Sequence, residues 1–114
     1  MSVNKIAYFE LPSSDLSALK AFYGKLFGWT FQDWGDDYAA VENGGMDGGF
    51  NADPASKSKA PMVMIQTADI EAAHKNVQEA GGTITMQIFA YPGGRRFHFR
   101  DPSGNELAVF QPGA

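Results

Sequence analysis

The chain of 114 residues contains no cysteine, and this absence narrows the chemistry that it can carry. Disulfide bonds, thiolate nucleophiles and cysteine-ligated metals are all excluded. The sequence also has no apolar run near the roughly 20 residues that a membrane-spanning helix needs, and no signal-peptide core at its start. We therefore expect a cytoplasmic protein with no membrane partner.

Basic residues are scarce as well. Nine Lys and Arg stand against 13 Asp and Glu, which gives a formal net charge of −4. Because proteins that bind nucleic acid normally carry a basic face, we expect no nucleic-acid partner. The hydrophobic content of 44% and the charged content of 19% are ordinary for a globular fold. We expect one domain that spans residues 1–114 and buries about two thirds of its unfolded surface.

Turn-forming residues fill positions 101–105, and the runs on both sides alternate between apolar and polar residues. This pattern predicts a β-hairpin with a four- or five-residue loop. If Phe97 and Phe99 lie on the core face, a five-residue loop places His98 opposite Ala108 and Arg100 opposite Glu106. The polar face of this hairpin is the surface most indicative of function.

Two segments of the chain show the same order of predicted elements. The first has a strand at 6–11, a helix that begins after Asp15 and ends at Gly28, and strand-like runs at 29–34, 38–42 and 46–51. The second has a strand at 62–67, a helix that begins after Asp69 and ends at Gly81-Gly82, a strand at 83–89 and the hairpin.

An offset of 54 residues superposes the two segments and aligns Asp15 with Asp69 and Gly28 with Gly82. We infer a duplicated β-α-β-β-β unit, with unit one at about 4–51, a polar linker at about 52–61 and unit two at about 62–112. The alternation on most strands favours an α+β fold in which the two units pair their sheets around a cavity, with the helices outside.

The first predicted helix, with Phe22-Tyr23 and Phe27-Gly28-Trp29, and the turn at 101–105 resemble a known family. The chain is similar to the vicinal-oxygen-chelate superfamily, which includes glyoxalase I, bleomycin-resistance proteins, fosfomycin-resistance transferases and extradiol dioxygenases. The resemblance implies a cavity for a small molecule. In metal-dependent members it also implies ligand positions that correspond here to Tyr8, Met62 and Ala108, with a fourth in the run 46–51, where Asp47 is the carboxylate.

Tyr8, Met62 and Ala108 are not ligating types, so we infer that the family's metal site is lost and that no cofactor is needed. The leading hypothesis is therefore a protein that binds a small anionic or aromatic molecule without a metal. One alternative is a metal-dependent lyase or isomerase of the glyoxalase class with a rearranged site, using Glu10, His98 and Glu106. Another is a dimeric interaction or regulatory module whose cavity is vestigial.

Ten residues are candidates for the ligand-binding surface: Tyr8, Glu10, Trp34, Met62, Met64, Arg96, His98, Arg100, Glu106 and Ala108. Two guanidinium groups and an imidazole on one strand face would suit a carboxylate or a phosphate. Structural roles compete with this interpretation. Arg100 would pair with Glu106 across the hairpin, and Glu10 would form a salt bridge to Arg96 or Arg100.

The remaining polar side chains of interest have simpler expected roles. Arg95 faces the other way from Arg96 and is expected to be solvated, and His74 is expected to lie on the surface of the second helix. A chain of this size has limited means to shield two open sheet edges, so we expect a symmetric homodimer held by apolar surface.

Overall fold

The structure is a computed structural model that describes residues 3–113. These residues form two compact parts, each described by itself: residues 8–62, here called the N-terminal module, and residues 63–113 with 3–7, here called the C-terminal module. No helix among the described residues has the length and apolar character needed to cross a bilayer.

The N-terminal module contains the first β-α-β-β-β unit. In chain order its elements are β1 (Lys5–Pro12), α1 (Leu16–Phe27), β2 (Phe31–Asp33), β3 (Tyr38–Val41) and β4 (Gly48–Asn51). The strands run in the order β2-β3-β4-β1, with β1 parallel to β4 and the other neighbours antiparallel. The predicted runs 29–34 and 46–51 are shorter as strands, and Thr30 N–H instead donates to the side chain of Asn43 (2.8 Å).

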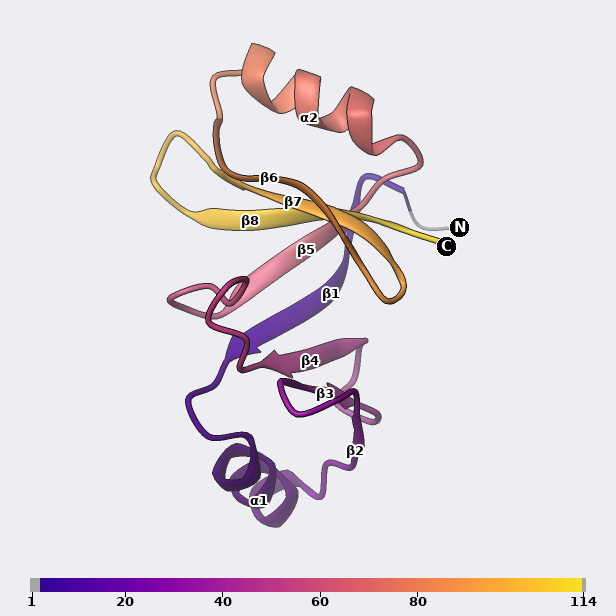
Figure 1. Ribbon diagram of the computed structural model, residues 1–114, viewed down its shortest axis with the longest axis vertical. Helices are drawn as coiled ribbons and strands as arrows, with labels where there is room; N and C mark the ends of the chain where they lie inside the picture. The colour runs from indigo at the N-terminus through magenta and orange to yellow at the C-terminus, as the bar shows by residue number, and fades with distance from the viewer. Residues whose placement is uncertain (1–2, 114) are drawn as a thin grey trace. The chain divides into compact units, whose positions relative to one another are not determined.

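The C-terminal module repeats this order with β5 (Met62–Gln66), α2 (Ile70–Glu79), β6 (Thr83–Tyr91), β7 (Gly94–Arg100) and β8 (Glu106–Pro112). Its strands run β5-β8-β7-β6, with β5 parallel to β8 and two antiparallel pairs. Helix α2 packs on one face of β6, β7 and β8 (Figure 1). The chain thus has an α+β fold with two β-α-β-β-β modules of mixed sheet, as the sequence predicted.

Both predicted helix starts and ends are confirmed. Asp15 Oδ1 accepts a hydrogen bond from Ala18 N–H, and Asp69 Oδ1 accepts one from Ala72 N–H, each at 3.1 Å. Helix α1 ends at Gly28, which adopts φ 73°, a left-handed conformation that glycine reaches without steric cost. Each of the two units therefore begins its helix with a capping aspartate.

The two modules bury different cores. In the C-terminal module, Ile70, Phe97 and Val109 form the centre, with Val77 and Phe99 packed against them. In the N-terminal module the core is an aromatic group in which Tyr23 stacks on Trp29 (ring centroids 5.0 Å apart) and contacts buried Phe50 (5.6 Å).

One predicted feature of helix α1 differs. Helical spacing from Leu16 allows either Phe22 or Tyr23 to face the core, and it also places Leu26 on the apolar side of the helix. Tyr23 makes the core contacts, whereas Phe22 is 56% exposed and Leu26 is 55% exposed. Neighbouring aromatic positions on a helix differ by about 100° in direction, and periodicity alone does not separate them here.

Candidate functional site

The hairpin β7–β8 has the predicted register. Phe97 pairs with Val109 on the core face, while His98 pairs with Ala108 and Arg100 with Glu106 on the polar face. The loop is fixed by the carboxylate of Asp101. Its Oδ1 accepts from the backbone N–H groups of residues 103 and 105, and its Oδ2 accepts from the Asn105 amide, all at 2.9 Å. These bonds, the Asn105 amide first, lower the pKa of Asp101.

Arg96 is the centre of the polar face of the C-terminal module. It lies on β7 and is buried, with only 6% of its surface exposed. The guanidinium carbon lies 5.4 Å from the ring centre of Phe89 and 5.9 Å from that of Tyr91, both on β6. Nη1 lies 3.9 Å from the thioether of Met64 on β5. Cation–π contacts of this kind are worth about 0.5–2 kcal/mol, more when water is excluded.

His98 lies two residues further along the same face and is 1% exposed. Its Nδ1 is 3.7 Å from Glu106 Oε2, and its ring centre is 5.9 Å from that of Phe89. Glu106 Oε2 also accepts a hydrogen bond from the hydroxyl of Thr85 on β6 (2.8 Å). A buried imidazole is thus held between an aromatic ring and a carboxylate.

The expected ion pair between Arg100 and Glu106 is not formed. The two residues face each other in the register, but the Glu106 carboxylate turns to Thr85 and His98. Arg100 is exposed at the end of β7, so a pair there would gain little in water.

The side chain of Arg95 is partly exposed to solvent, as expected, but it also forms an ion pair that the sequence did not predict. Its guanidinium donates to both carboxylate oxygens of Glu71 on α2, with Nη2 to Oε1 at 3.1 Å. These hydrogen bonds lower the pKa of Glu71. His74 on the same helix is hydrogen-bonded through Nε2 to Oε1 of Gln87 (2.8 Å). Its ring packs edge-on against Phe97, with the ring centres 5.1 Å apart, so it is part of the packing between α2 and the sheet.

The N-terminal module carries a second polar group, on the face of β1 that bears Tyr8 and Glu10. Glu10 is completely buried. Its Oε2 accepts from the hydroxyl of Tyr38 on β3 (2.8 Å), and its Oε1 accepts from the amide of Asn51 on β4 (3.1 Å). The hydroxyl of Tyr8 lies 2.8 Å from that of Tyr38. Since the single Tyr38 proton goes to Glu10, Tyr8 is the donor to Tyr38.

This arrangement keeps Tyr38 neutral. Burial, and then the nearby charges of Glu10 and Tyr8, raise the pKa of Tyr38 far above its ordinary value. A phenol in such a place is a fixed hydrogen-bond donor over the physiological range. Neither Tyr38 nor Asn51 was among the predicted site residues, because neither stands in the alternating pattern that singled out Tyr8 and Glu10.

Gly49 is the residue that brings Tyr38 to Glu10. In the sheet, Gly49 pairs with Glu10 on one side and with Ala40 on the other, so strand β4 separates β3 from β1. A Cβ atom built on Gly49 would overlap the Tyr38 ring and hydroxyl. The neighbouring Gly48 leaves the same kind of space for the ring of Phe9. The pair of glycines thus makes room on β4 for aromatic side chains of the neighbouring strands.

The profile of the Glyoxalase/Bleomycin resistance protein/Dioxygenase superfamily matches residues 5–109. The chain belongs to this superfamily. The resemblance inferred from the first helix and the turn at 101–105 is therefore confirmed.

Two relatives of this chain are curated proteins of Streptomyces. The chain is 32% identical to the anthracycline biosynthesis protein DauV of Streptomyces sp. (strain C5), over 94% of this chain and 46% of that protein. It is 31% identical to the anthracycline biosynthesis protein DnrV of Streptomyces peucetius, with the same coverage. The chain thus spans about half the length of these relatives.

Solved structures show the same fold at low sequence identity. A Legionella pneumophila protein described as an NAD-dependent benzaldehyde dehydrogenase has a TM-score of 0.75 and 15% identity, covering 93% of this chain and 98% of that one. A superfamily member from Vibrio splendidus 12B01 has a TM-score of 0.70 and 17% identity, covering 91% and 96%. The Mn(II)-bound glyoxalase of Novosphingobium aromaticivorans has a TM-score of 0.68 and 20% identity, covering 96% and 39%.

Some superfamily proteins hold a metal, so the residues at the corresponding positions of this chain matter. The Tyr8 hydroxyl is bonded to Tyr38, Met62 offers only a thioether, and Ala108 has no donor atom. Asp47 is exposed just before β4. Among residues 3–113, no three His, Cys, Asp or Glu side chains are grouped as a metal site. A divalent site needs at least three protein ligands, and the residues present do not fit one.

The other predicted site residues lie in different surroundings. Met62 and Met64 are buried on β5, at 3% and 2% exposure. Trp34 follows β2 and is 61% exposed. Within the C-terminal module the structure brings Met64, Arg96 and His98 onto one polar face with Glu106 and Ala108, and within the N-terminal module it joins Tyr8 to Glu10 through Tyr38. Their role in binding a ligand stays a prediction.

Proposed function

We propose that this protein binds a small planar aromatic molecule that carries an anionic group, and that it does so without a metal ion. Arg96 is the residue that recognises the anion. The observation that supports this role is the setting of its guanidinium, which is buried among two aromatic rings and a thioether. The buried face of β7 binds the ligand and carries out no chemical step.

The chemistry of the face suits both halves of such a ligand. A guanidinium has five N–H donors in a planar fork and offers bidentate bonds to a carboxylate. Each charge-assisted hydrogen bond made there would contribute about 1.5–3 kcal/mol. Phe89, Tyr91 and the soft thioether of Met64 are surfaces against which a flat ring system packs favourably.

The curated relatives support an aromatic ligand. Both are named as anthracycline biosynthesis proteins, and anthracyclines as a chemical class contain a flat system of fused rings. Since this chain covers only 46% of each relative, a shared ligand class is part of the proposal. The relatives therefore provide the choice of first probe.

The test is a fluorescence titration with an anthracycline, and a parallel calorimetric titration with 2-naphthoate as a planar carboxylate. We expect Arg96→Ala to weaken binding of at least one probe roughly tenfold or more, the loss of one charged hydrogen bond. Arg95→Ala is the matched control, because Arg95 is the adjacent arginine on the opposite face of β7 and pairs with Glu71. It should bind as the unchanged protein does.

Two further measurements make the result decisive. Thermal unfolding of each variant separates a role in binding from a role in the scaffold: an Arg96→Ala protein that is destabilised but binds both probes normally would refute the proposal. Repeating the titrations in a chelator tests the metal-dependent alternative. Binding that disappears in chelator and returns with a divalent ion would favour the glyoxalase-class enzyme instead.

A further inference from the structure

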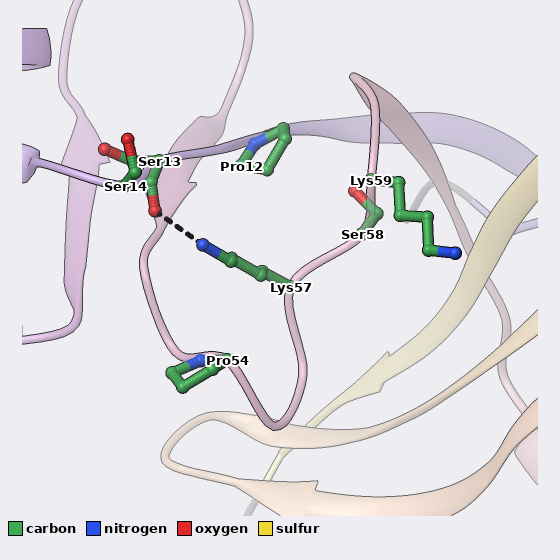
Figure 2. Close-up of a pocket in the computed structure, with 7 residues that line it drawn as sticks. All are labelled: Pro12, Ser13, Ser14, Pro54, Lys57, Ser58 and Lys59. Carbon is green, nitrogen blue, oxygen red and sulfur yellow. Dashed lines mark hydrogen bonds between the residues drawn. The ribbon is translucent and has the colours of Figure 1, made fainter.

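A groove of about 490 Å³ opens in the N-terminal module, where the end of β1 meets the segment that follows β4 (Figure 2). Hydrogen bonds fix both of its sides. Ser13 N–H donates to Asn51 C=O (2.9 Å), and the Asp53 carbonyl accepts from the N–H of Lys57 (2.9 Å). Seven residues line the groove: Pro12, Ser13, Ser14, Pro54, Lys57, Ser58 and Lys59.

Lys57 is the most informative of these residues. Its half-buried side chain crosses the groove, and Nζ donates to the Ser13 carbonyl at 3.1 Å (Figure 2). An ammonium group has three N–H donors, and this bond uses one of them. Within residues 3–113, no carboxylate lies within the 4.0 Å ion-pair distance of Lys57. The groove thus holds a positive charge that the described part of the protein does not neutralise.

The hydroxyl groups extend this donor surface. Ser13 Oγ accepts from Asp15 N–H (3.1 Å), which leaves its own proton for another acceptor. Ser14 is exposed at the mouth of the groove, and Ser58 donates to the Ala60 carbonyl (2.6 Å). No acidic residue lines the groove, whereas the whole chain has a net charge of −4. Both ionisable side chains that line the groove are therefore basic.

We propose that this groove binds a phosphate monoester. The Lys57 ammonium and the hydroxyls of Ser13 and Ser14 bind the phosphate oxygens, and the organic part of the ester lies against the rings of Pro12 and Pro54. A lysine ammonium acts as a point charge, and the serine hydroxyls are donors at separate positions. This arrangement suits a tetrahedral phosphate dianion better than a flat carboxylate. A volume of 490 Å³ falls within the usual range for small-molecule sites and exceeds what a bare phosphate fills.

Lys59 has a secondary part in this site. It is exposed at the rim, and its amine points away from that of Lys57 in Figure 2. Its four-carbon side chain is flexible. Lys59 therefore attracts an approaching anion by its charge but makes no fixed contact with it. The site shares no residue with the proposed aromatic site around Arg96, and either proposal can fail alone.

The test is a titration of the isotope-labelled protein with phenyl phosphate, followed by amide chemical shifts. We expect saturable shifts at residues 12–14 and 57–59. Lys57→Met should weaken binding roughly tenfold or more, because it removes a charged donor and keeps the length of the side chain. Lys75→Met is the matched control: it removes the same charge from an exposed position on α2. It should leave the affinity unchanged.

Other probes define the ligand class. Inorganic phosphate that binds as tightly as phenyl phosphate would keep the phosphate site and assign the free anion as its ligand. Benzoate that binds as tightly would overturn the choice of phosphate. If Lys57→Met does not fold, Lys57→Arg retains the charge and should retain most of the affinity.

Two results would overturn the proposal as a whole. One is the absence of saturable shifts in the groove at millimolar phenyl phosphate. The other is an equal loss of affinity in Lys57→Met and Lys75→Met, which would mean that the anion responds only to net charge.

Discussion

Replacing Gly49 by alanine tests whether Tyr38 has to cross strand β4 to reach Glu10. The added methyl group would overlap the Tyr38 ring, so the ring must move and both of its hydroxyl bonds, to Glu10 and Tyr8, are lost. The bond to the buried carboxylate is worth about 1.5–3 kcal/mol and the bond to Tyr8 about 1 kcal/mol. Overpacking adds about 1–3 kcal/mol. We expect Gly49→Ala to lower the free energy of unfolding by roughly 3.5–7 kcal/mol.

A double-mutant cycle measured by urea unfolding isolates the contact between the added methyl group and the Tyr38 ring. Tyr38→Phe removes only the hydroxyl, so it should cost roughly 2–4 kcal/mol. In a Tyr38→Ala background the ring is gone, and Gly49→Ala should then be nearly neutral, or slightly stabilising because alanine is favoured over glycine within a strand. If Gly49→Ala costs the same in both backgrounds, the clash is not with Tyr38 and the crossing has no energetic role.

Three further predictions follow from the structure. The pKa of Tyr38 is raised in the folded protein, so near pH 10.0 the phenol ionises only in the unfolded chain. The free energy of unfolding should therefore fall as pH rises above that value. The Tyr38→Phe variant should lose less of this free energy between about pH 9 and about pH 11. Since Tyr8, Met62 and Ala108 do not ligate metals, elemental analysis should find no stoichiometric Zn²⁺, Ni²⁺, Mn²⁺ or Fe²⁺; near one equivalent retained through chelator dialysis would contradict this. We propose a symmetric homodimer held by apolar strand and loop surface, to which the exposed side chains of Ile6 (57%), Val63 (37%) and Met46 (41%) contribute. Light scattering should give twice the chain mass of 12.3 kDa. A mass near 12.3 kDa at tens of micromolar would show the proposal wrong.

The parts of the fold that local rules determine could be predicted from the sequence. The Asp101 turn and the alternation around it determined the pairing of His98 with Ala108, and the two capping aspartates determined the helix starts. In each case the signal lies within a few residues of the structure that it specifies. The hairpin and the caps therefore follow from turn chemistry and from hydrogen bonds that the local backbone requires.

The polar contacts of the candidate sites were harder to predict, because they depend on which of several possible partners a side chain reaches. Glu106 stands opposite Arg100 on β7, yet its carboxylate accepts a hydrogen bond from Thr85 on β6, the strand beyond β7. Arg95 pairs with Glu71, a residue 24 positions away on α2. Register fixes neighbours on a face, but it does not fix rotamers, and solvation makes the exposed alternatives nearly equal in energy.

The two adjacent glycines of β4 have a consequence for how related sequences vary. Gly48 and Gly49 each leave space for one aromatic side chain from a neighbouring strand, Phe9 and Tyr38. A homologue that gains a side chain at 49 should therefore lose the large aromatic at 38 in the same lineage, and the same holds for positions 48 and 9. In a superfamily this divergent, that paired substitution would mark the members that retain the buried Glu10 network.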